Sequence, residues 1–243
     1  MQPTVQLSKA DSKVLAQVFD PESSPNRPEV LVDPSLPPDA RIQDQDLLST
    51  LKAQEKRAIR VIEEYEKSRG TSSPSKEAAY LSALSILDNL ISQRPEYASA
   101  RNNRAQLRRW RFEDRRLLFS ATKSEGLAAV HDLQTSISLA SPGRPSEAVS
   151  PGQGKLLAQS YTQLAAIYHA GSKDLAEASS NDIEIDGEKW TGQRFEEEAS
   201  RLFYLGALYG NEVAKALAVH TNPHAKLCGN IVKEAMRKEI EGV

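Results

Sequence analysis

The chain has 243 residues, of which 39% are hydrophobic and only 6% aromatic, a balance that favours helices over sheets. A formal net charge of −2 excludes a general attraction to nucleic acid or to an anionic membrane. The single cysteine, Cys228, excludes an internal disulfide framework. Because no stretch reaches the roughly 18 apolar residues of a membrane helix, and the first residues lack a signal-peptide pattern, we expect a cytoplasmic protein, with the nucleus as an alternative.

The first 45 residues differ in composition from the rest. Four apolar residues share one face of a short helix predicted over 10–19: Val14, Leu15, Val18 and Phe19. A helix this short is marginal alone, so we expect it to dock on its own domain, to bind a partner or to fill the protein's own binding groove, with disorder as the remaining alternative. Residues 21–45 contain six prolines and indicate an extended linker. We predict an N-terminal region over 1–45 and a helical domain over 46–243.

The helical domain shows apolar residues at spacings of three and four, which is typical of amphipathic helices. Pro95 lacks a backbone N–H and ends one helix, and a second helix opens at Ala98. Small and large apolar residues recur in pairs at the positions expected in the second helix of a tetratricopeptide (TPR) repeat: Ala83 and Leu87, Ala129 and Leu133, and Ala199 and Phe203.

We therefore predict an all-α, TPR-like helical-hairpin solenoid of about three repeats, over about 46–97, 98–142 and 155–210. Capping helices over 212–240 would cover its exposed end. Residues 144–154 and 172–193 are expected to be loop insertions. The predicted core includes four large residues: Leu87, Leu133, Leu164 and Phe203.

Seven arginines lie between Arg101 and Arg116, with Trp110 among them. Arginine suits phosphates and carboxylates, so an acidic partner or a nucleic acid is conceivable, but a helix spreads these residues over several faces. A solvated or internally paired surface is the leading interpretation. The acidic residues of 182–188 and 196–198 are the expected counter-charges.

Metal binding and catalysis have weak signals. His220, His224 and Cys228 are spaced by four, but Asn222 and Pro223 interrupt the helix and no fourth ligand is evident. The sequence has no Gly-rich phosphate loop, nucleophile elbow or zinc-helix motif. We expect no enzyme, no cofactor and no metal.

Three segments carry a resemblance to a known family: Val14 to Pro21, Ala98 to Gln106, and Asn222 to Asn230. They resemble the N-terminal helix, the second-repeat opening and the C-terminal signature of the tetratricopeptide repeat protein 36 family. The resemblance implies a small three-repeat adaptor without catalytic residues. It also implies Hsp70-class chaperone binding and a role in tyrosine catabolism.

The candidate partner-binding residues lie on the first helices of the repeats, which would form the concave groove: Arg60, Asn103, Arg104, Gln159 and Gln163. The carboxylate clamp of chaperone-binding TPR proteins uses Lys, Asn and Arg to hold an acidic tail. Asn103 falls at one clamp position, but Gln159 and Gln163 supply no charge, so most of the clamp is missing. We expect a monomeric protein-binding adaptor, with an Hsp70-class co-chaperone as its candidate role. The alternative is a scaffold that stabilises a metabolic enzyme through its convex face or loops.

Overall fold

The structure is a computed structural model, and it describes residues 30–68, 75–144, 147–178 and 182–222. The helix predicted over 10–19, the last capping helix, His224 and Cys228 lie outside the described residues. Every element named below belongs to the unit that begins at Leu31.

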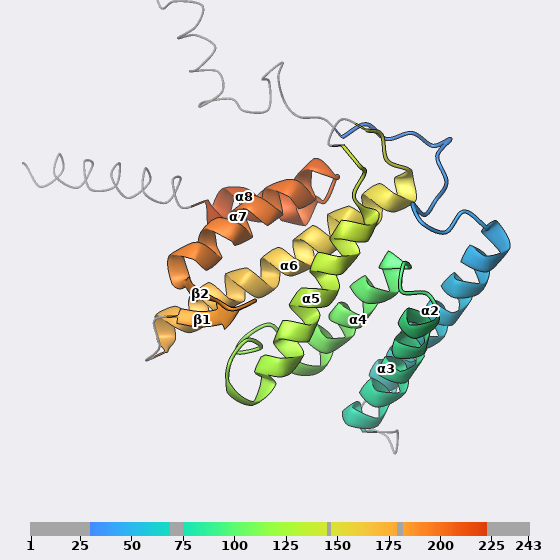
Figure 1. Cartoon of the computed structure of the whole chain (residues 1–243). Helices are drawn as coiled ribbons and strands as arrows, with labels where there is room; N and C mark the ends of the chain where they lie inside the picture. Colours follow the sequence, from blue (N-terminus) through green and yellow to red (C-terminus); the bar gives the residue numbers. More distant parts are fainter. Residues whose placement is uncertain (1–29, 69–74, 145–146, 179–181, 223–243) are drawn as a thin grey trace, which may run out of the picture. The chain divides into compact units, whose positions relative to one another are not determined.

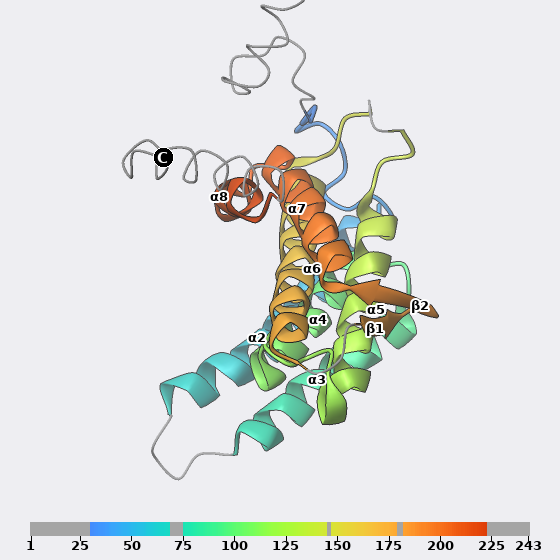
Figure 2. The ribbon, with the colours of Figure 1, turned by 90° about the vertical axis from the view of Figure 1, so that its left-hand side faces the viewer.

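Seven α-helices and one two-stranded hairpin make up the described part of the chain (Figure 1), which confirms the predicted helical-repeat fold. Each helix packs mainly against its neighbours in the sequence. Figure 2, a view from another side, shows α8 lying beside α7. The elements are α2 (Gln45–Lys67), α3 (Lys76–Gln93), α4 (Ala98–Phe112), η1 (Ser120–Thr122), α5 (Lys123–Ala140), α6 (Pro151–Glu177), β1 (Asp182–Ile185), β2 (Glu188–Thr191), α7 (Gly192–Leu208) and α8 (Glu212–Thr221). None of these helices has the length and hydropathy required to cross a membrane.

Side-chain caps set where several helices begin. Asp44, Ser75 and Asn211 each accept hydrogen bonds from backbone N–H groups of the first turn of α2, α3 and α8. Helix α6 begins at Pro151, four residues before the predicted start at Lys155. The reason is a capping box, in which Ser150 and Gln153 satisfy each other's backbone N–H groups.

The core positions predicted from the repeat pattern are buried. Leu87, Leu133, Leu164 and Phe203 are between 0% and 3% exposed. Small residues allow close helix packing, as at Gly206 of α7, where an added Cβ would lie 2.7 Å from Thr162 Oγ1 of α6. The paired small and large apolar residues of the repeat pattern are therefore the residues that pack consecutive helices together.

A β-hairpin occupies part of the predicted loop over 172–193, and it corrects the expectation of a purely irregular insertion there. Strands β1 and β2 pair antiparallel around Asp186 and Gly187, whose φ angles are 51° and 81°. An Asp-Gly pair with positive φ is the preferred two-residue hairpin turn. Trp190 of β2 packs against the rings of Tyr168 and Phe195, with ring centres 5.0 and 5.2 Å apart.

Residues 31–33 of the proline-rich linker are joined to the segment before α6 by backbone hydrogen bonds. Val149 N donates to Leu31 O and Val149 O accepts from Asp33 N, both at 2.9 Å. The side chains of Leu31 and Val32 remain more than half exposed. The contact is therefore made by the backbone rather than by apolar burial.

Candidate partner-binding groove

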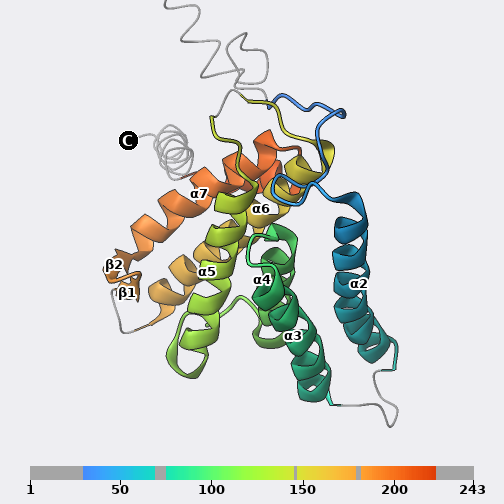
Figure 3. The same cartoon turned by 45° about the vertical axis from the view of Figure 1, so that its right-hand side comes forward.

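An open apolar groove lies between α2 and α4, with α3 as its floor; Figure 3 shows these three helices side by side. Its volume is about 410 Å³. We call it the α2–α4 groove, and it is lined by Ala58, Ile59, Ile62, Glu63, Glu66, Ala83, Leu87, Asn103, Gln106, Leu107 and Trp110.

Helical periodicity explains how the sequence builds the two walls. On α4 the lining residues occur at intervals of three and four, from Asn103 to Trp110, so they form one stripe along the helix. On α2 the stripe runs from Ala58 to Glu66. Ala58 and Ala83 are almost fully buried and short, and their small side chains leave space between the larger residues.

A buried carboxylate fixes α2 against the start of α4. Glu55 is 6% exposed and accepts a 2.6 Å hydrogen bond from the Tyr97 hydroxyl and a 3.0 Å hydrogen bond from Asn103 Nδ2. Burial disfavours the charged form and raises the pKa of the Glu55 carboxyl above its ordinary value of 4.5, although these hydrogen bonds oppose the shift. Burial and the neighbouring Glu55 also raise the pKa of Tyr97.

Trp110 fixes the wall of the groove farther along α4. Its Nε1 donates a 2.8 Å hydrogen bond to Glu66 Oε1 of α2, and its ring packs edge-on against Tyr65. Lys76 Nζ lies 5.0 Å from the ring centre, a cation–π distance. Hydrogen bonds therefore join α2 and α4 both at Glu55 and at Glu66, eleven residues apart on α2.

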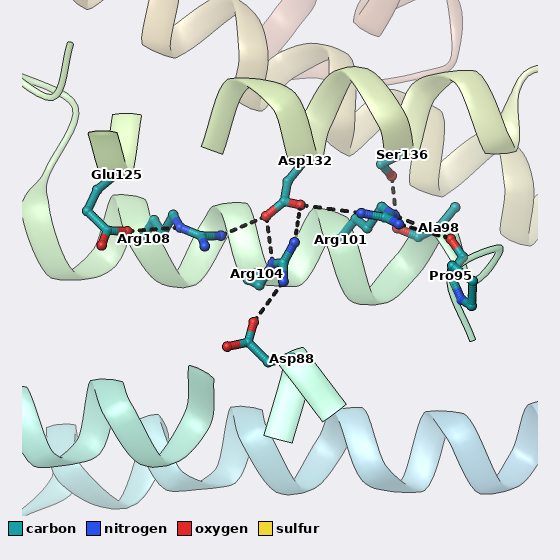
Figure 4. A network of polar contacts seen from close by, with 9 residues as sticks. All are labelled: Asp88, Pro95, Ala98, Arg101, Arg104, Arg108, Glu125, Asp132 and Ser136. Atoms are coloured by element: carbon teal, nitrogen blue, oxygen red, sulfur yellow. Dashed lines mark hydrogen bonds and ion pairs between the residues drawn. The ribbon is translucent and has the colours of Figure 1, made fainter. Parts of the chain in front are cut away.

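The arginines of α4 are paired within the protein, as the leading interpretation predicted. Figure 4 shows Asp132 of α5, which is 1% exposed, accepting hydrogen bonds from Arg104 and Arg108, with Arg101 3.8 Å away. We call these four residues the Asp132 cluster. Arg104 also donates to Asp88 of α3 at 2.7 Å. Burial alone would lower the pKa of Arg104, but the hydrogen bonds to the two aspartates outweigh it and raise the pKa.

The counter-charges were not the ones expected. Arg109 pairs with Asp114, Arg111 with Glu77, and Arg115 with Asp174 and Glu177. Together with Asp88, Glu125 and Asp132, these carboxylates belong to α3, α5, α6 and the α4–α5 connection. Two of the acidic residues of 182–188 and 196–198 instead pair close to their own segment, Glu188 with Arg194 and Glu198 with Arg201.

The structure distributes the five predicted contact residues over different places. Asn103 lines the α2–α4 groove, whereas Arg104 belongs to the Asp132 cluster. Gln163 of α6 is nearly buried, donates to Asn102 Oδ1 at 2.9 Å and accepts from Arg109 Nη1 at 3.1 Å. Arg60 and Gln159 are exposed, on α2 and α6 respectively, outside the lining of this groove. A partner contact at any of the five stays a prediction.

Sequence reasoning did not assign several of the larger lining residues to a binding site: Ile59, Ile62, Gln106, Leu107 and Trp110. Ile59 and Ile62 are three residues apart, a spacing typical of the apolar face of a helix, and that apolar pattern was the available signal. Such a pattern cannot distinguish a stripe that is covered by the next helix from one that is left open. Ile59 is 45% exposed.

Metal binding at the histidines finds no support in the described residues. Within residues 30–68, 75–144, 147–178 and 182–222, no three His, Cys, Asp or Glu side chains are grouped as a metal site. Two of the three candidate ligands, His224 and Cys228, lie outside those ranges.

The stacked helix pairs and the open groove define an all-α helical-repeat protein. Comparison with known proteins gives its family. The chain is 38% identical to the L-tyrosine degradation gene cluster protein hmgX of Aspergillus fumigatus, over 98% of this chain and 94% of that protein. This chain belongs to the same family as that protein.

A second relative supports the TPR resemblance over part of the chain. Tetratricopeptide repeat protein 36 of Danio rerio is 30% identical over 156 residues, which cover 64% of this chain and 60% of that protein. No protein-family model and no solved structure matches the chain.

Proposed function

We propose that this protein is a non-catalytic adaptor that binds another protein through the α2–α4 groove. The observation that carries the proposal is the groove itself: an apolar floor between two helices whose separation is fixed by Glu55 and by the Trp110–Glu66 hydrogen bond. Rigid walls reduce the conformational entropy lost on binding. The polar residues of the lining are two glutamates, an asparagine and a glutamine, and they contain no nucleophile paired with a base.

The names of the two relatives indicate where such an adaptor would act. One relative is named for an L-tyrosine degradation gene cluster and the other for its TPR repeats. We infer that the partner is an enzyme of tyrosine degradation, which the adaptor would stabilise or regulate.

Binding of an Hsp70-class chaperone tail has less support. Of the five candidate contact residues only Asn103 lines the groove, and its side-chain amide already donates to Glu55. Two glutamates in the lining would repel the carboxylates of an acidic tail.

The test is affinity capture of tyrosine-degradation enzymes from native extract with three forms of the full chain. Ile59→Arg places a charge in the groove, and Leu81→Arg places the same charge on α3 at a residue that is 53% exposed and outside the groove. We expect wild type and Leu81→Arg to capture the same enzyme and Ile59→Arg to lose at least nine-tenths of it. Equal capture by all three forms would contradict binding in the groove and would indicate a binding site on the convex face or the loops.

A further inference from the structure

The dimensions of the α2–α4 groove suit a short helix. Its stripe on α2 covers eight residue steps and its stripe on α4 covers seven, or about 10–12 Å at 1.5 Å per residue. This length corresponds to about two turns of an α-helix. An occupant would therefore present apolar side chains at positions i, i+3 or i+4, and i+7.

The walls of the groove favour a helical occupant over an extended one. Both walls are helices, whose backbone N–H and C=O groups are bonded within the helix, so they offer no edge for β-strand addition. Asn103 is one of two amide side chains in the lining, and it is already bonded to Glu55. An occupant must satisfy its own backbone, as a helix does.

The two charged residues of the groove lining, Glu63 and Glu66, are both negative. Glu63 and Glu66 are exposed members of the lining. The nearby arginines of α4 point elsewhere: Arg104 and Arg108 bind Asp132, and Arg111 binds Glu77. Cations lie outside the lining: Lys76 lies over the Trp110 ring, and Arg60 and Lys67 are exposed residues of α2 next to Ile59 and Glu66 in sequence.

We propose that the α2–α4 groove binds an amphipathic helical segment of a partner protein, in which two or three apolar residues are flanked by lysine or arginine. This inference rests on the proposed adaptor function and adds the chemistry of the partner. The apolar residues enter between Ala58, Ala83 and Leu107, and a cation of the partner lies against Glu63. Charge complementarity sets both the specificity and the association rate of such a complex.

The experiment selects peptides from a displayed library of random 16-residue sequences against the full-length protein, with Ile59→Arg as the counter-selection. We expect enriched peptides to share helical apolar spacing with adjacent Lys or Arg. The best peptide is then synthesised, and its affinity is measured by fluorescence anisotropy. The proposal would be overturned if acidic sequences were enriched. It would also be overturned if no peptide bound wild type in preference to Ile59→Arg.

A matched pair of charge reversals tests the position of the cation. Glu63→Lys should weaken binding of the selected peptide about tenfold or more. Glu64→Lys makes the same change at the adjacent exposed residue, which does not line the groove, and should alter affinity less than twofold. Equal effects of the two variants would show only a general charge attraction and would contradict the assignment of Glu63.

Two other occupants would give distinct results. A second copy of the chain would give a dimer by light scattering that Ile59→Arg dissociates. The chain's own N-terminal residues would give at least tenfold tighter peptide binding in a Leu15→Asp, Phe19→Asp variant. Either result would overturn the proposal that a helix of a partner protein occupies the groove. If the enzyme capture fails while basic peptides bind as expected, the partner in tyrosine degradation is wrong but the chemistry of the groove stands.

Discussion

Arg104 and Asp132 form a two-pronged ion pair, with Nε 2.8 Å from Oδ2 and Nη2 2.6 Å from Oδ1. Asp132 is 1% exposed, so hydrogen bonds from the guanidinium groups of Arg104 and Arg108 take the place of water around its carboxylate. Replacing it with alanine leaves part-buried guanidinium groups without their shared counter-ion. We expect Asp132→Ala to lower the free energy of unfolding by about 3–5 kcal/mol, measured by urea denaturation.

Asp88 is the matched control, because it also pairs with Arg104 but its side chain is 50% exposed. Asp88→Ala should lower the free energy of unfolding by no more than about 1 kcal/mol. Similar losses of unfolding free energy for the two variants would show that burial of Asp132 does not increase its contribution to stability.

Glu55 should make stability depend on pH. Its folded-state pKa lies above the ordinary 4.5 because burial disfavours the carboxylate, so the folded protein binds a proton more readily than the unfolded chain. Its contribution to stability is therefore complete below pH 4.5 and is lost as the pH rises through the folded-state pKa. Glu55→Gln removes this dependence.

The measurement is urea unfolding of wild type and Glu55→Gln at several values from about pH 4 to 7. We expect the free energy of unfolding of the variant minus that of wild type to increase as the pH rises, because only wild type loses stability. A difference that falls with pH would show that the hydrogen bonds from Tyr97 and Asn103 outweigh burial and lower the pKa of Glu55.

Gly126 is required by the close approach of α5 to the connection that precedes it. An added Cβ would lie 2.4 Å from the Leu117 carbonyl oxygen, a backbone atom. We expect Gly126→Ala to lower the free energy of unfolding by about 1–3 kcal/mol, although alanine favours helix. Gly154→Ala is the control, because its Cβ would meet Val149 at an ordinary 3.5 Å. If Gly126→Ala were as stable as wild type, the close approach to the Leu117 carbonyl oxygen would be contradicted.

Leu87 packs in the core of the first helix pair and also forms part of the groove floor. Leu87→Ala should lower the free energy of unfolding by about 2–5 kcal/mol. Leu81→Ala, at an exposed position of the same helix, should change it by less than about 0.5 kcal/mol. Thermal and urea unfolding would measure both, and a loss at Leu87 of under about 0.5 kcal/mol would remove it from the core.

The helices could be predicted because their signals are local. Ser75 caps α3 and Pro95 precedes α4, and both boundaries follow from the properties of a few adjacent residues. Local signals were also present where the predictions failed. The Asp186-Gly187 turn indicates a hairpin, and Ser150 with Gln153 forms a capping box, but both lay in segments interpreted as loops.

The candidate site was harder to predict because it depends on which helices meet. Arg104 and Asn103 are adjacent in sequence, yet the first bonds to α5 and the second to α2. Only the packing of three helices decides that one of them lines the groove. The same applies to Ile59, whose exposure follows from the separation of α2 and α4 rather than from its own helix.

Trp110 gives this protein a built-in optical reporter. The chain has two tryptophans; Trp110 lies in the groove wall, and Trp190 lies on the hairpin among Tyr168 and Phe195. In a Trp190→Phe variant, all tryptophan emission would come from Trp110 in the groove wall. Occupancy of the groove could then be followed in solution without attaching a dye to either molecule.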